Sequence, residues 1–168
     1  KKYVLRKDGA VRQMHAVVKD SEKGRLIAQR TVDPHKVRTK YGKGDIYRTT
    51  LLAKLLTLMA VKASSLDPFG IGLEMDTEKP GWCDALNGMP GLLGSSTHEA
   101  FALKRAVEFT RQFVESALPA AGSVRVSAEV AAFIRSITGI LIQANRSDFF
   151  STWHQLATRR ESYRAEIR

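Results

Sequence analysis

Four carboxylates lie close together in the middle of the chain, in a stretch that also carries a tryptophan. They are Glu74, Asp76, Glu78 and Asp84, and Trp82 comes two residues before the last of them. An indole face packs on the axial hydrogens of a sugar ring, while carboxylates bond to its hydroxyls. Cleaving a glycosidic bond also needs a carboxylic acid that protonates the leaving oxygen, and burial suits this role because it raises the pKa of the acid. These residue types predict a carbohydrate site with Asp84 as the general acid.

The stretch around these residues is predicted to be a long acidic loop. Residues 67–95 hold six of the twelve glycines and three of the five prolines, and a long ordered loop in a compact domain is usually functional. A structural interpretation stays open, in which Asp84 caps a helical turn and Trp82 fills the core. We predict no metal site, because the segment lacks the ligand alternation and central glycine of a calcium loop.

Two segments carry a resemblance to a known family. "GWCDALNGM" (81–89) and "GSSTHEAFAL" (94–103) resemble the active-site stretch of the cellobiose-phosphorylase-like family of glycosidases and phosphorylases. The resemblance implies that Asp84 is the general acid and that Trp82 and Asn87 match the family's Trp and Asn. The chain departs from the pattern where Gly81, Cys83 and Ala85 replace Asp, Asn and Gly. The match covers only part of the chain, about residues 46–118.

The resemblance also implies a fold and a mechanism. The family's catalytic domain is an (α/α)₆ toroid of about twelve helices, each of ordinary length, and this chain has the pattern of about four. We therefore expect a helical bundle or a partial toroid, and favour a fragment of a larger polypeptide over a complete, smaller scaffold. The implied mechanism is inverting. Its substrate would be an oligosaccharide or a glycosyl phosphate, and neither the sugar nor the linkage is specified.

Two nucleophiles are open for this mechanism. Hydrolysis needs a second carboxylate as base, for which we select Glu74, with Asp76 and Glu78 as further candidates that also bind substrate. Phosphorolysis needs cationic and hydroxyl donors for inorganic phosphate, which would then be a co-substrate. The candidates are Arg48, Ser95, Ser96 and the start of the helix that follows. No other cofactor is predicted.

The elements around the loop are predicted to be mainly helical. Residues 1–45 read as a basic β-hairpin or flap, with Asp8-Gly9 at the turn and residues 25–32 as a third strand. Residues 46–168 read as the helical region. Residues 46–66 form its first helix, whose wide apolar stripe indicates burial on two sides. Further helices are expected at 96–118, with a capping box from Ser96 to Glu99, and at 127–144. A last helix is expected after Ser147 or Asp148, with Phe149, Phe150 and Trp153 in the core and the Arg-rich stretch 158–168 facing solvent.

The charge distribution offers other functions. Residues 1–54 hold 15 Lys and Arg against 5 Asp and Glu, whereas residues 55–168 hold 12 of each. The basic third suits a nucleic acid or another polyanion, but only three aromatic residues lie there, which argues against base stacking. A third hypothesis is a helical assembly module that completes a partner's barrel or forms a homo-oligomer. The single cysteine and the lack of an apolar leader predict a cytoplasmic protein. The longest apolar run is too short for a membrane span.

Overall fold

The 168-residue chain was analysed as a computed structural model, which describes residues 3–5, 11–13, 20–74, 95–117, 122–145 and 148–167. Its described helices are α1 (Ser21–Ala28), α2 (Leu51–Ala63), α4 (Thr97–Ala117), α5 (Ala128–Ile142) and α6 (Phe149–Ile167). Its described strands are β1 (Tyr3–Leu5), β2 (Val11–Gln13), β3 (Leu73–Glu74) and β4 (Ser95–Ser96). The prediction of a mainly helical fold with a small β-hairpin is confirmed.

The N-terminal hairpin forms as predicted, but the third strand does not. Strand β1 pairs with β2 in antiparallel register, Leu5 opposite Val11, so the connection contains Asp8-Gly9. The prediction of a strand at 25–32 is wrong, because its first four residues belong to α1. Asp20 caps this helix, its carboxylate accepting from the backbone N–H of Lys23 at 3.0 Å. The stretch 21–28 has only one β-branched residue, Ile27, so little opposes the helix.

Side-chain caps set the starts of the longer helices. In each case a side-chain oxygen of the capping residue accepts a hydrogen bond from the backbone N–H three positions later. The capping residues are Thr50, Ser96, Ser127 and Asp148. The predicted cap at Ser96 is confirmed, and of the two candidates for the last helix Asp148 is the cap. Ser127, where the third long helix was expected to begin, caps that helix. The first long helix starts later than predicted, at Leu51 instead of Ile46. Ile46 is held in a β-bridge with Arg38, and the N–H of Tyr47 donates to the carbonyl of Val37 at 2.8 Å.

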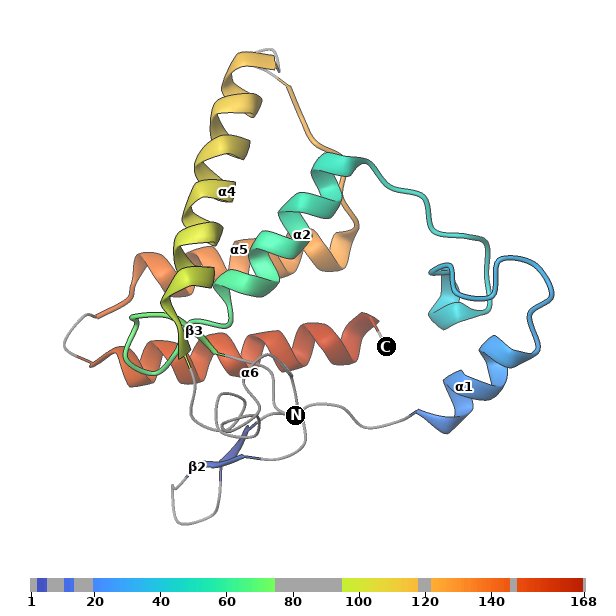
Figure 1. Cartoon of the computed structure of the whole chain (residues 1–168), viewed down its shortest axis with the longest axis horizontal. Helices are drawn as coiled ribbons and strands as arrows, with labels where there is room; N and C mark the ends of the chain where they lie inside the picture. The colour runs from blue at the N-terminus through green and yellow to red at the C-terminus, as the bar shows by residue number, and fades with distance from the viewer. Residues whose placement is uncertain are drawn as a thin grey trace.

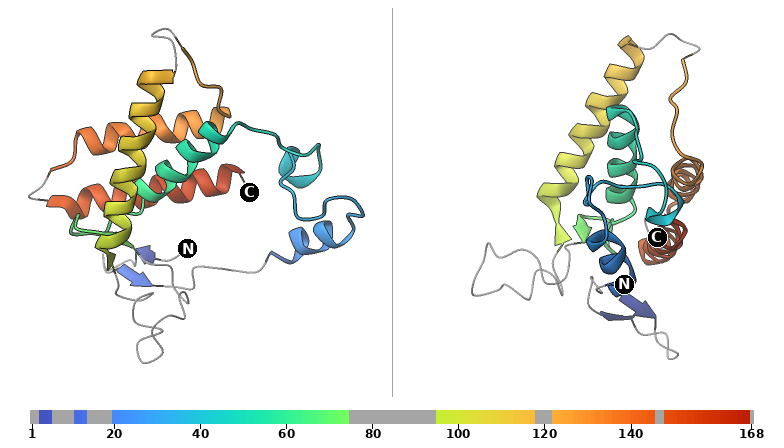
Figure 2. Two further views of the ribbon diagram at one scale, coloured as in Figure 1. Left: turned by 45° about the horizontal axis from the view of Figure 1, so that its top comes forward. Right: turned by 90° about the vertical axis from the view of Figure 1, so that its right-hand side faces the viewer.

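The helices stack in three layers, with α2 in the middle (Figure 1; Figure 2, right). On one side α2 packs on α5, which lies beside α6, and on the other side it packs on α4. The core is centred on Phe133 and Leu156, neither of which is exposed. The ring of Phe133 stacks on Tyr163 with centroids 4.3 Å apart, and burial raises the pKa of Tyr163. The two-sided burial predicted for the first long helix is confirmed.

Helix α4 is covered on one side only. Thr110, its one fully buried residue, donates to the carbonyl of Ala106 and faces Met59 of α2. Phe101 and Phe109 leave 67% and 69% of their surface exposed, and Phe113 is about half exposed. At 100° per residue these three rings lie on a common side of the helix, displaced from Thr110. The described part of the chain therefore leaves three aromatic rings of α4 uncovered, with the exposed Arg105 and Gln112 on the same side of the helix. This side is here called the α4 aromatic face.

Replacing Phe133→Ala should remove the centre of the core. The change deletes a fully buried ring and its stacking partner's contact, so we expect a loss of about 3–5 kcal/mol in the free energy of unfolding. Urea denaturation followed by circular dichroism measures this loss. The matched control is Phe101→Ala on the exposed side of α4, which should change stability by no more than about 0.5 kcal/mol. Equal losses in both variants would contradict the assigned core.

Candidate functional site at the base of the 75–94 segment

The structure describes four of the nine residues that the sequence selects for a site. Glu74 ends β3, Ser95 and Ser96 form β4, and Arg48 lies in the extended stretch before α2. The other five lie outside the described residues: Asp76, Glu78, Trp82, Asp84 and Asn87. The site is therefore built from the two ends of the 75–94 segment and from the helices that hold them.

A short antiparallel ladder brings these two ends together. Leu73 pairs with Ser96, and Glu74 pairs with Ser95. Leu73 also bridges to Leu66, and the N–H of Glu74 donates to the carbonyl of Ser65 at 2.8 Å. Figure 1 shows β3 close to the start of α4 and beside α6. The segment 75–94 thus begins and ends at one place on the helical stack, which we call the stem (residues 64–74 and 95–96).

Asp67 fixes the turn that leads into the stem. Its side chain is almost fully buried, and one carboxylate oxygen accepts the N–H groups of Phe69 and Ile71 at 2.8 and 3.2 Å. Its other oxygen accepts from the hydroxyl of Ser95. Gly72 lies so close to β4 that an added Cβ would stand 2.3 Å from the Ser95 Oγ. The two ends of the segment are therefore joined by side chains as well as by the ladder.

Glu74 is a residue of the stem whose side chain bonds to the last helix. Its side chain is about 5% exposed, and one carboxylate oxygen accepts the indole N–H of Trp153 at 2.7 Å. The other carboxylate oxygen pairs with Arg160 Nη2 at 3.2 Å. Both partners belong to α6, so this carboxylate connects β3 to the last helix. With both oxygens engaged, the buried carboxylate is held in position, and its partners replace the hydrogen bonds that it would make to water.

Arg160 is the functional residue that the sequence reasoning missed. It lies in the stretch predicted to face solvent, yet it is only 4% exposed. Besides Glu74 it bonds to the carbonyl of Ser64 and to the hydroxyl of Ser65, through Nη1. Its Nε is buried and has no partner in the described part of the chain. The signal that could have found it is its spacing, because Trp153, Leu156, Arg160 and Tyr163 recur at three and four residues on the buried side of α6.

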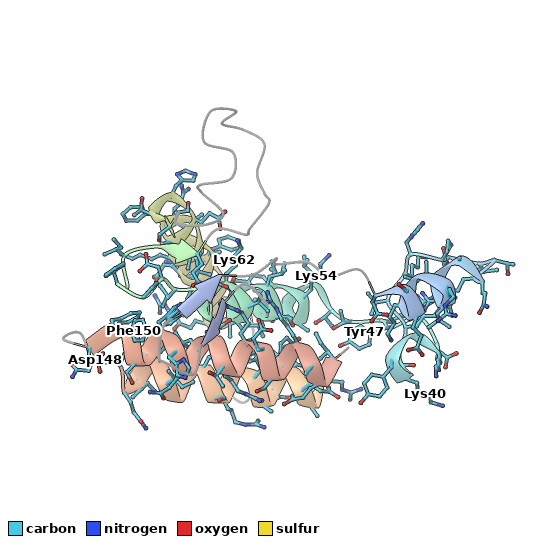
Figure 3. The ribbon with its side chains drawn as sticks, turned by 90° about the horizontal axis from the view of Figure 1, so that it is seen from below. Lys40, Tyr47, Lys54, Lys62, Asp148 and Phe150 are labelled. Carbon is cyan, nitrogen blue, oxygen red and sulfur yellow. The ribbon has the colours of Figure 1, made fainter. Side chains whose placement is uncertain are left out.

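The predicted phosphate ligands do not meet in one place. Ser95 donates to Asp67, and Ser96 accepts from the start of α4, so both hydroxyls are engaged within the stem. Arg48 precedes α2, whereas the stem follows that helix, and thirteen residues of helix span about 20 Å. Figure 3 shows Tyr47, the neighbour of Arg48, far from Lys62 at the other end of α2. The structure brings Glu74, Ser95 and Ser96 together and leaves Arg48 apart.

Metal and membrane signals are absent from the part of the chain that the structure describes. No three His, Cys, Asp or Glu side chains there come close enough to hold a metal ion. None of its helices is long and apolar enough to cross a membrane.

No protein-family model, curated protein or solved structure matches this chain. The family resemblance of residues 81–103 therefore depends on its motif alone.

Replacing Glu74→Gln should weaken the fold through its ion pair. Gln can still accept the indole N–H of Trp153, but it leaves the buried Arg160 guanidinium without a counter-charge. We expect a loss of about 3–5 kcal/mol in the free energy of unfolding, measured by urea denaturation. The matched control is Glu166→Gln, which removes an ion pair between Arg159 and a 43% exposed side chain and should cost less than about 1 kcal/mol.

A double-variant cycle separates the ion pair from the packing of Glu74. The double change Glu74→Gln with Arg160→Met removes both charges, so its cost should fall well below the sum of the two single costs. Additive losses would show that the two side chains do not depend on each other.

Proposed function

We propose that this chain is a carbohydrate-active protein, a glycoside hydrolase or phosphorylase or part of one. In this proposal Asp84 donates a proton to the glycosidic oxygen, and a water or an inorganic phosphate attacks from the opposite face. The motif "GWCDALNGM" supplies the acid, the tryptophan and the asparagine. The proposal rests on that motif together with the stem on which its segment stands.

The observation that carries the proposal is the construction of the stem. A catalytic acid works only when its position is fixed to within a fraction of an ångström, which demands rigid supporting elements. The stem holds both ends of the 75–94 segment through the β3–β4 ladder, the Asp67–Ser95 hydrogen bond and the Glu74–Arg160 ion pair. These contacts join the two ends of the segment, and the role of Asp84, ten residues beyond Glu74, rests on the motif.

The contacts of Glu74 assign it a positioning role. A general base needs a free oxygen to accept a proton from water, and both oxygens of Glu74 are bonded to α6. The base for hydrolysis then falls to Asp76 or Glu78, which follow directly in the sequence. An inverting hydrolase would hold that base about 6.5–9.5 Å from Asp84. Ser95 and Ser96 have structural roles in the stem, so phosphate would need other ligands.

The test uses the full chain with a panel of mono- and disaccharides, in the presence and absence of phosphate. We expect selective amide NMR shifts for one sugar and measurable turnover, with released sugar in water or sugar phosphate when phosphate is added. Replacing Asp84→Asn should preserve binding and lower turnover by about 100-fold or more, because it removes the proton donor. Asp45→Asn, in the exposed stretch before Ile46, is the matched control. A chain that binds no sugar, or an Asp84→Asn variant with full turnover, overturns the proposal.

A second function, helical assembly, is favoured by the α4 aromatic face. Phe101, Phe109 and Phe113 expose their rings on a side of α4 that also carries Arg105 and Gln112, and the Arg111 ion pairs with Glu108 and Glu115 lie next to it. Such a surface suits the apolar face of another helix, as in a larger helical barrel. This function is compatible with a carbohydrate site in the same protein.

The double change Phe109→Ser and Phe113→Ser tests this assembly role. An uncovered aromatic face associates with its own copies, so the unaltered chain should sediment faster as its concentration rises. The double variant should sediment as a monomer, and Lys104→Ser on the charged side should behave like the unaltered chain. A chain that is monomeric at every concentration would contradict the assembly role.

A further inference from the structure

Residues 20–50 form a small unit beside the helical stack (Figure 1; Figure 2, left). Within it, arginine side chains donate to backbone carbonyls. Arg30 donates to the carbonyls of Pro34 and Gly42. Arg38 donates to the carbonyl of Val32 at 3.0 Å. A carbonyl satisfies the donors of a guanidinium but leaves its positive charge uncompensated. The unit therefore keeps the charge of its own internal arginines.

The surface of this unit adds further cations. Residues 20–50 hold eight Lys and Arg against four Asp and Glu. Four of the cations are exposed and form no hydrogen bond or ion pair in the described part of the chain: Arg25, Lys40, Lys43 and Arg48. On the helical stack, Arg111, Arg159 and Arg164 each pair with a glutamate. Lys54, Arg105 and Arg135 there are also exposed and form no hydrogen bond or ion pair in the described part of the chain. Residues 20–50 thus carry a net charge of +4, eight cations against four acids, and one of these cations, Lys36, is paired with Asp33.

Tyr41 projects from this basic surface. Its ring is 65% exposed, and its backbone carbonyl is held by the ammonium of Lys23. Lys40 and Tyr41 both have positive φ, 51° and 54°, in the left-handed region that costs a non-glycine residue about 1–2 kcal/mol. Gly42 follows with φ 92°, where an added Cβ would lie 3.0 Å from Arg30. The turn is held in this conformation by Lys23 and Arg30, and the aromatic ring stays in solvent.

A hollow of about 660 Å³ lies next to the ring, between α1 and residues 41–43. Its lining includes Lys23, Arg25, Gln29, Tyr41 and Lys43, with Asp20 and Glu22 among the other lining residues. This volume falls in the range of ligand sites, roughly 300–1,000 Å³. Tyr47 is a second partly exposed ring, and Figure 3 shows it beside Lys40 at the same end of the molecule.

We propose that the unit formed by residues 20–50 binds single-stranded nucleic acid. Arg25, Lys40, Lys43 and Arg48 contact phosphates, and Tyr41 stacks on an unpaired base. Cations that track the backbone and an exposed aromatic ring that receives a base are the two components of such sites. A duplex hides its base faces, so an exposed tyrosine ring has nothing to stack on there. Helix α1 has no buried residue and only eight positions, too few for a helix that inserts into a membrane surface.

The test measures fluorescence anisotropy of a labelled oligothymidine of about 12 nucleotides with the full chain over a series of salt concentrations. We expect binding that weakens steeply with salt and that is tighter for the single strand than for a duplex of equal length. Lys43→Gln should weaken binding and lower the slope of log K against log salt by about 0.7, the value for one phosphate contact on a single strand. Lys104→Gln, a cation removed from α4, is the charge-matched control and should leave the slope unchanged.

Tyr41→Leu tests the stacking contact, with circular dichroism as the check that the fold is retained. We expect affinity to fall at least about fivefold with no change in the salt slope, because stacking carries no charge. Phe69→Leu, an exposed ring outside the unit, is the aromatic control. The proposal is overturned if the oligonucleotide does not bind, if Lys104→Gln acts like Lys43→Gln, or if Tyr41→Leu changes nothing. Equal or tighter binding of heparin or of anionic vesicles also overturns it. These readouts are independent of sugar binding and turnover, so failure here leaves the carbohydrate proposal standing.

Discussion

The buried ion pair between Glu74 and Arg160 is the constraint on which the centre of the molecule depends. It joins residues 86 positions apart, and the same arginine reaches the carbonyl of Ser64 at the end of α2. Three elements thereby meet at one guanidinium: β3, α6 and the C-terminal end of α2. Burying both charges costs several kcal/mol per ion, and their attraction offsets that cost only with good geometry and further hydrogen bonds. Trp153, Ser64 and Ser65 supply those bonds. An apolar cluster of the same size would stabilise as well, but it would not fix the direction in which β3 leaves the stack.

The layered packing follows from the composition of α2. Its buried positions are Ala53 and Ala60, two small residues seven positions apart and therefore on one face of the helix. Ala60 belongs to the core cluster that includes Phe133 and Leu156, so this face lets α5 and α6 approach closely. Leu52, Leu55 and Leu56 of α2 are partly buried, whereas Leu51 and Leu58 are exposed. Helix α4 lies across the outer side of α2, held there by the Lys62–Glu99 ion pair near its start and by Thr110 against Met59. Because one helix cannot cover the whole of a second, the outer side of α4 is left with its aromatic residues in solvent.

The local features of this fold could be predicted from the sequence, and its long-range features could not. Ser96, Ser127 and Asp148 were predictable as caps because a cap depends on residues three positions apart. Helix α1 was missed because Leu26, Ile27 and Val32 suggested a strand, whereas the Asp20 cap decided the outcome. At the site, Glu74 was selected for its type, but its partners lie 79 and 86 residues away. Arg160 was judged by its charge, although its position on the apolar side of α6 indicated burial. The charge of Arg160 predicts an exposed side chain, whereas its spacing from Leu156 and Tyr163 predicts a buried one. The structure agrees with the spacing.

The arginines at the two proposed sites have different hydrogen-bond partners. In the stem, Arg160 meets a carboxylate, so its charge is neutralised and serves only to hold a carboxylate and a strand in place. In the unit of residues 20–50, Arg30 and Arg38 donate to backbone carbonyls. These bonds stabilise the turns, and no carboxylate in the described part of the chain neutralises the charge of the two guanidinium groups. The field of that charge extends about one Debye length, roughly 8 Å at physiological salt. Since α2 alone spans about 20 Å, the basic surface around Arg48 has little influence on the stem. The electrostatics of the stem are therefore set by its own neighbours, and the two proposed functions do not depend on each other's charges.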